Sequence, residues 1–345
     1  MNFVVMLKIK SIVSVLFVLN LIVSIPACKN DSRKRYISET DTTYSEDIRS
    51  ITKKINENPD NAELYYKRAN TFFFERNFKQ ATADIDYAIA LDSTKALYDF
   101  LRAKSLISGD TANSREAIKS FKKAIRLQPD YIEAMLEYGK LLIARQMYDE
   151  AEKIYVACNR KDPSNPQPYF YLGLMAKEMQ DTLKAVTLFE KTLVYDGNYY
   201  DAVMQLGNYY AVSGNDKALV FFDRAIRLNP YSDEALYAKG LFLQKKQLYK
   251  DAAALYEEVY KMNPGHILCR YNLAYINALF SNYDKALKLL DETISLANNY
   301  AEAYALRGLV REKMNDKMRA ADDYRKALEL DETLEQAKAG MKRVS

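Results

Sequence analysis

A pattern that recurs about every 34 residues constrains the fold of this chain more than any other feature of its sequence. The first unit begins at Ala62, and later units follow at spacings of 34, 36, 34, 34, 33, 34 and 34 residues. The eight units thus begin at Ala62, Ala96, Ile132, Pro166, Tyr200, Asp233, Ile267 and Ala301. A repeat of this length encodes one small supersecondary unit, and stacked units share a core that grows along an axis. The chain can therefore form one long array instead of several globular domains.

Every unit keeps small residues at two positions. The eighth position holds Ala69, Ala103, Gly139, Gly173, Gly207, Gly240, Ala274 and Gly308. Near the twentieth stand Ala81, Ala117, Ala151, Ala185, Ala218, Ala252, Ala286 and, one place out of step, Ala321. Four residues after each of these alanines (three for Tyr324) come the apolar residues Ile85, Phe121, Tyr155, Phe189, Phe222, Tyr256, Leu290 and Tyr324. Residues four apart share one face of a helix, so each unit is predicted to be two helices that cross closely at the small residues.

The unit length and the two small positions resemble the tetratricopeptide repeat over Ala62 to Asp331. The resemblance implies an all-α superhelical solenoid of eight helical hairpins. An apolar stripe over 46–58, with Ile48, Ile51 and Ile55, predicts a leading helix, and 334–344 predicts a capping helix with a polar outer side. We therefore expect the solenoid to extend over 46–345, with about eighteen helices and no sheet.

Three departures from a regular repeat bear on the packing. The extra residues of the second unit fall in 108–115 and the missing residue of the fifth in 212–217, where turns between paired helices are expected. Proline closes four units, at Pro129, Pro163, Pro230 and Pro264, where it ends one helix before the next begins. The family's tryptophan near position four is absent, and Asp99 and Arg270 make the second and seventh units the least regular.

The N-terminus has the layout of a secretory signal peptide at 1–27. Residues 11–25 are almost wholly apolar, and Lys8 and Lys10 precede them. The stretch is shorter than the ~20 residues that comfortably cross a bilayer. Ile25-Pro26-Ala27-Cys28 resembles the lipobox of bacterial lipoproteins, which implies cleavage before Cys28 and lipidation of its sulfur. Translation from Met6 would give a more typical signal peptide than translation from Met1, and both starts stay open.

Residues 28–45 show no apolar helical stripe and are predicted to be a flexible, lipid-anchored tether. The resemblance to lipoproteins implies a protein of the cell envelope that a lipid attaches to a membrane. A lysine instead of an aspartate directly after the cysteine, at Lys29, resembles the sequence of lipoproteins sent to the outer membrane. We therefore expect anchoring in the outer membrane, facing the periplasm.

Tetratricopeptide arrays bind other proteins, as extended peptides or helices, on the concave surface that their first helices form. The resemblance implies that positions two, five, nine and twelve face this groove. Here they include Tyr66, Asn70, Phe73, Phe100, Lys104, Leu136, Lys140, Phe170, Met204, Asn208, Tyr237, Leu241, Tyr271 and Tyr275. The mixture of rings, amides and lysines is suited to a protein partner. Alternatively, several of these rings pack against the neighbouring unit.

An enzyme is the competing class, and the sequence does not favour it. The one histidine, His266, lies in a turn, and the carboxylates are scattered over exposed helix faces. Cys158 and Cys269 belong to distant units and are expected to fill the core, not to form a disulfide or a metal site. We predict a non-enzymatic interaction scaffold or adaptor with no cofactor or metal. A structural subunit of an envelope secretion or cell-wall assembly machine is the alternative.

Charge argues against nucleic acid as a partner. Lysine and arginine total 50 and the acids 46, and both signs alternate along every predicted helix. Nucleic-acid-binding modules concentrate basic residues on one face. We therefore expect protein or peptide partners, and a membrane through the lipid anchor.

Overall fold

The computed structural model describes residues 38–109 and 113–344, which form eighteen α-helices and no strand. The all-α fold predicted from the repeat is thus confirmed. The chain divides into two compact units, residues 1–59 and 60–345. The predicted signal peptide, Cys28 and the first part of the predicted tether lie outside the described residues. No helix of the described part is long and apolar enough to cross a membrane.

The first unit contains helix α1 (Glu46–Glu57), at the place where a leading helix was predicted. Ser45 caps its N-terminus, because the Ser45 side chain accepts a hydrogen bond from the amide of Ile48. Ile48 and Ile55 are buried as the apolar stripe predicts, and Thr52 is buried with them.

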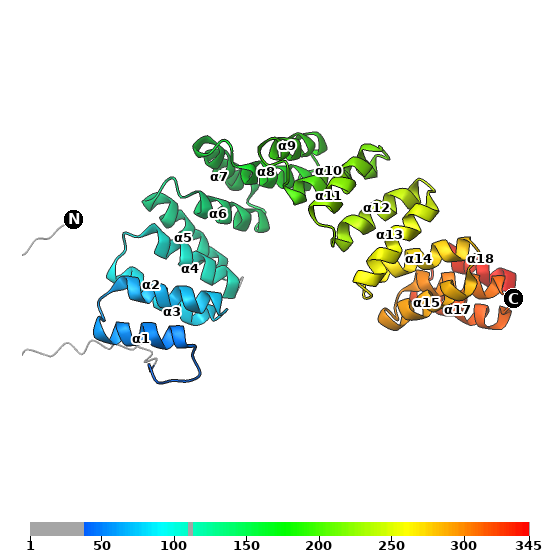
Figure 1. The fold of residues 1–345 in the computed structure, drawn as a ribbon, viewed down its shortest axis with the longest axis horizontal. Helices are drawn as coiled ribbons and strands as arrows, with labels where there is room; N and C mark the ends of the chain where they lie inside the picture. The colour runs from blue at the N-terminus through cyan, green and yellow to red at the C-terminus, as the bar shows by residue number, and fades with distance from the viewer. Residues whose placement is uncertain (1–37, 110–112, 345) are drawn as a thin grey trace, which may run out of the picture. The chain divides into compact units, whose positions relative to one another are not determined.

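The second unit contains eight helical hairpins and a final helix (Figure 1). The first helices of the hairpins are α2 (Ala62–Phe74), α4 (Ala96–Gly109), α6 (Ile132–Ala144), α8 (Pro166–Glu178), α10 (Tyr200–Val212), α12 (Asp233–Lys245), α14 (Ile267–Leu279) and α16 (Ala301–Lys313). The second helices are α3 (Phe78–Leu91), α5 (Ser114–Leu127), α7 (Tyr148–Lys161), α9 (Thr182–Tyr195), α11 (Lys217–Leu228), α13 (Tyr249–Met262), α15 (Tyr283–Leu296) and α17 (Lys317–Leu330). Helix α18 (Glu335–Val344) ends the array where a capping helix was predicted.

Within the second unit, from α2 to α18, each helix packs against its neighbours in the chain, as expected of a solenoid. First helices of consecutive hairpins also contact each other directly, as α2 does with α4, α6 with α8, α10 with α12, and α14 with α16. The first helices therefore line a common face of the array. The irregular repeat lengths fall between paired helices, since α4 ends at Gly109 before α5 begins at Ser114, and α10 ends at Val212 before α11 begins at Lys217.

The small residue at position eight lies against the large apolar side chain of the paired helix. A Cβ atom added to Gly139 would lie 2.4 Å from Cζ of Tyr155, and one added to Gly207 would lie 2.8 Å from Cε1 of Phe222. Real Cβ atoms do not approach other atoms so closely, so the two helices could not cross at this distance with a larger residue. Similar contacts occur at Gly173, Gly240 and Gly308.

The structure corrects the assignment of the second small position in the eighth unit. Ala320, not Ala321, is fully buried in the core formed with Tyr324 and Ala327, while Ala321 is partly exposed. Ala320 precedes Tyr324 by four residues, so the eighth unit keeps the same register as the other seven. The apparent shift arose because two alanines are adjacent in the sequence.

Candidate functional site

The residues predicted to face the groove all lie on first helices, but they differ in exposure. Residues at the fifth position are mostly enclosed: Phe100 is 5% exposed, Leu136 6%, Phe170 6% and Met204 2%. Leu241 and Tyr275, at the ninth position, are 40% and 36% exposed, and Asn208 is also exposed. The remaining predicted residues are half-buried: Tyr66, Asn70, Phe73, Lys104, Lys140, Tyr237 and Tyr271. The ninth position therefore offers more surface to a partner than the fifth.

Several rings at the fifth position pack on a ring that comes just before the next first helix. Ring centroids are 5.0 Å apart for Phe100 and Tyr131, and 4.9 Å apart for Phe170 and Tyr199. Tyr271 and Tyr300 repeat the contact at 5.1 Å. Aromatic pairs at these separations stabilise the packing beyond the area that they bury. For Phe100 and Phe170, the interpretation of the ring as packing between units is the one that the structure supports.

The two lysines of the predicted groove are held in place by rings and carboxylates. The Nζ of Lys104 lies 5.3 Å from the ring centroid of Phe73 and 5.1 Å from that of Phe100. The Nζ of Lys140 lies 2.7 Å from a carboxylate oxygen of Glu137 and 5.2 Å from the ring of Tyr171. The Nζ of Lys104 also lies 3.9 Å from a carboxylate oxygen of Glu133, so each ammonium has an acid beside it and this face carries no concentrated positive charge.

His266 and the two described cysteines have structural roles. The Nδ1 of His266 accepts a hydrogen bond from the amide of Cys269 at 3.2 Å, which caps the N-terminus of α14. Its ring lies 4.5 Å from that of Tyr237, centroid to centroid. Cys158 and Cys269 are free and fully buried, as the prediction of core fillers requires. Burial raises the pKa of the Cys158 thiol to about 11, which keeps it protonated and unreactive near neutral pH.

The irregular units contain buried ion pairs where the family has an aromatic residue. Asp99 is 3% exposed, and its carboxylate lies 2.9 Å from Nζ of Lys123 on the paired helix. Arg270 is 5% exposed and lies 3.4 Å from the carboxylate of Glu292. The two pairs occupy equivalent positions with their charges exchanged. The sequence identified the irregular positions but not the compensating partners.

Two residues that line the same face were missed by the sequence analysis. Gln244 is at position twelve of its unit and Asn272 at position six, and both border a hollow between α12 and α14. Gln244 is at one of the positions that face the groove in the family. Asn272 is not, because position six is not one of them.

The geometry defines a class of proteins built from stacked helical hairpins that present their first helices on one face. Models of the family described as "Tetratricopeptide repeat" match residues 113–178 and 301–334. A model described as "Anaphase-promoting complex, cyclosome, subunit 3" matches residues 212–293. The chain is a tetratricopeptide repeat protein.

Curated relatives and solved structures agree with this assignment. Anaphase-promoting complex subunit 3 of Schizosaccharomyces pombe is 28% identical over 49% of this chain and 26% of the relative. The human mitochondrial import receptor subunit TOM70 is 27% identical over 49% of this chain and 29% of the relative. The chain thus matches less than a third of the length of either protein. The structure of Pseudomonas aeruginosa pilF has a TM-score of 0.52 with 16% identity, over 64% of this chain and 98% of that chain, and shows the same fold.

Proposed function

We propose that the protein is a non-enzymatic scaffold that holds protein partners along the face formed by its first helices. The observation that carries the proposal is the exposure of the ninth-position side chains, Asn208, Leu241 and Tyr275, on an array whose other recurrent residues are used in packing. Exposed rings and aliphatic side chains among amides supply contact area together with hydrogen bonds. The relatives named as a complex subunit and an import receptor subunit support an interaction role.

Cross-linking from defined positions tests this proposal. A photoreactive phenylalanine analogue at Asn70 or Asn208 samples the face of the first helices, and the same analogue at the exposed Ala254 of α13 samples a second helix. We expect adducts with the same partner proteins from Asn70 and Asn208, and none from Ala254. Adducts from Ala254 alone would favour the structural-subunit alternative, in which partners attach to other faces.

We also propose that lipid on Cys28 attaches the scaffold to a membrane of a bacterial envelope, with the outer membrane favoured. The lipobox-like segment and the polar run that follows it support this location. At least two acyl chains are needed for stable anchoring, and a lipoprotein cysteine carries several. Cys28→Ser is expected to abolish incorporation of labelled palmitate and to move the protein to the soluble fraction. Unchanged labelling and membrane retention of Cys28→Ser would refute the anchor and leave the interaction role untouched.

A further inference from the structure

A hollow of about 380 Å³ opens between the first helices of the sixth and seventh hairpins, α12 and α14, beside the start of α13. Leu241, Tyr271 and Tyr275 supply its apolar lining, and Gln244, Asn272 and Lys245 its polar lining. Leu241 and Tyr275 are among the exposed residues of the face formed by the first helices. The hollow thus combines an accessible apolar surface with two side-chain amides.

Hydrogen bonds to two tyrosines orient these amides. The Nδ2 of Asn272 donates to the hydroxyl of Tyr237 at 3.1 Å, and the hydroxyl of Tyr256 donates to Oε1 of Gln244 at 2.9 Å. Burial raises the pKa of both tyrosines, so each hydroxyl keeps its proton at neutral pH. The nitrogen of Asn272 and the oxygen of Gln244 are therefore directed to the tyrosines, which leaves the opposite atom of each amide for other contacts.

The two remaining amide atoms are a donor, Nε2 of Gln244, and an acceptor, Oδ1 of Asn272. In the described part of the chain, no group forms a hydrogen bond with Nε2 of Gln244 or with Oδ1 of Asn272. Neither of these two atoms is buried. Both atoms are therefore accessible to solvent. A peptide group needs this combination, because its C=O accepts from an amide N–H while its N–H donates to an amide oxygen.

The charge of the hollow restricts the occupant further. The one ionic group in the lining, the ammonium of Lys245, donates to the backbone oxygens of Ala211 and Val212 at 3.4 and 3.0 Å. These carbonyls are in the last turn of α10, where a cation is stabilised by the helix dipole. The ammonium of Lys245 is thus used in a contact within the protein. The lining therefore has no cation available to select an anionic ligand.

We propose that this hollow binds the main chain of an extended, uncharged segment of a partner protein, with Gln244 donating to a peptide oxygen and Asn272 accepting from a peptide N–H. An aliphatic side chain of the same segment packs against Leu241 and Tyr275. A helical partner does not fit this chemistry, because the peptide groups of a helix are paired with one another. The inference deepens the proposed function and rests on it, since it names the kind of partner and the place where it binds.

Selection from a peptide library tests the inference. The full-length protein is equilibrated with bead-bound heptapeptides built from uncharged residues, with an acetyl group at one end and an amide at the other. We expect the retained peptides to share one aliphatic position. A scan with N-methyl residues then removes one peptide N–H at a time, and a single methylation next to the aliphatic residue should weaken binding roughly tenfold.

A double-mutant cycle assigns the effect to Asn272. Asn272→Ala should bind the selected peptide roughly tenfold more weakly, and the critical N-methylation should then have no further effect. Gln244→Met tests the donor in the same way and nearly keeps the volume of the side chain. Gln205→Ala is the matched control, because Gln205 has the equivalent sixth position of α10 and its Oε1 already accepts from Lys177. Thermal melting confirms that each variant is folded.

The outcomes separate this inference from the general function. Unchanged peptide affinity in both Asn272→Ala and Gln244→Met would overturn the binding mode, while cross-linking of partners from Asn70 and Asn208 would still support the scaffold. Equal loss of affinity in Gln205→Ala would show that the hollow has no special role. If the wild-type protein retains no peptide, or retains only peptides that are helical when bound, the inference is likewise overturned.

Discussion

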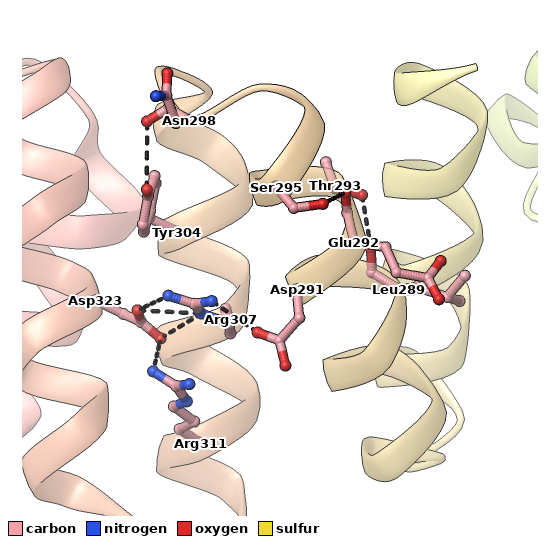
Figure 2. Close-up of polar contacts among 10 residues, drawn as sticks. All are labelled: Leu289, Asp291, Glu292, Thr293, Ser295, Asn298, Tyr304, Arg307, Arg311 and Asp323. Carbon is pink, nitrogen blue, oxygen red and sulfur yellow. Dashed lines mark hydrogen bonds and ion pairs between the residues drawn. The ribbon is translucent and has the colours of Figure 1, made fainter. Parts of the chain in front are cut away.

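The guanidinium of Arg307 on α16 donates to the buried carboxylate of Asp323 on α17, with Nη2 and Oδ1 2.7 Å apart (Figure 2). Its Nη1 lies 2.7 Å from the carboxylate of Asp291 in the preceding unit. The same geometry recurs, because Arg68 reaches Asp84 and Lys239 reaches Asp223, each at 2.6 Å and 16 residues away. A cation at the seventh position therefore connects paired helices in some units and consecutive units in others.

Replacing Arg307 and Asp323 together by apolar residues should cost less stability than replacing Asp323 alone. Asp323→Leu leaves the half-buried Arg307 without a partner within its hairpin, and we expect a loss of about 2–4 kcal/mol of stability. Arg307→Leu with Asp323→Leu should recover part of this loss, because the seventh unit already has Leu273 and Leu289 at these positions, while Arg311, whose Nη1 lies 2.7 Å from Oδ2 of Asp323, still loses its partner. Urea denaturation of the two variants measures the difference. Equal losses in both would mean that the ion pair is worth more than apolar packing here.

In the fifth unit, Gly207 should be matched to the ring that it faces, although the second unit combines Ala103 with Phe121. Gly207→Ala gains about 1 kcal/mol of helix propensity but forces a Cβ to within 2.8 Å of Phe222, and we expect overpacking by about 1–3 kcal/mol to outweigh the gain. Adding Phe222→Leu gives the pair used by the seventh unit, Ala274 with Leu290, and should recover most of the loss. Thermal melting tests this order. A Gly207→Ala variant at least as stable as wild type would contradict it.

The periodic small residues were sufficient to predict the hairpins and their order, because a crossing that excludes a Cβ leaves a direct mark on the sequence. The conformation of the turns could not be predicted from the sequence in this way. The fifteenth residue of seven units has a positive φ, but only one of the seven, Gly214, is a glycine. Gln146, Gln180 and Ser281, for example, adopt this conformation with φ between 57 and 63°, so the fold imposes it against their own preference.

The candidate site was predicted less completely than the fold. Side chains at the fifth position lie on the face formed by the first helices, yet Phe100 and Phe170 are covered by Tyr131 and Tyr199. Whether a ring on this face is exposed depends on the residue that precedes the next helix, which a rule based on position within one unit does not include. The amides of Gln244 and Asn272 were missed for a related reason, since their orientation depends on tyrosines from other helices.

His266 should contribute to stability through two separable contacts. His266→Ala removes both the cap of α14 and the ring against Tyr237, and we expect a loss of about 1–2 kcal/mol. His266→Asn keeps an acceptor for the cap, and His266→Phe keeps a ring, so each should lose less than alanine. Asn165→Ala, which removes the side-chain cap at the equivalent position of α8, is the matched control for the capping part. If all three changes at His266 are neutral in urea denaturation, neither contact stabilises the fold.

The Asp99–Lys123 pair should make stability depend on pH once the lysine is removed. Burial raises the pKa of Asp99 above its ordinary value of 3.8, and Lys123 opposes this shift. Lys123→Met removes the opposition, so the pKa of Asp99 should rise further and the buried charge should cost about 1–3 kcal/mol at pH 7. A carboxyl with a raised pKa in the folded state stabilises the fold fully below its unfolded pKa and loses this contribution as pH rises through its folded pKa.

The loss in Lys123→Met should therefore be large at pH 7 and shrink as the pH falls to about 4. Adding Asp99→Asn removes the titrating group, and the double variant should differ from wild type by an amount that changes much less between these pH values. Urea denaturation of the three proteins at both pH values provides the comparison. A Lys123→Met penalty that stays constant with pH would mean that the lysine stabilises the second unit through packing of its aliphatic chain, not through the charge of Asp99.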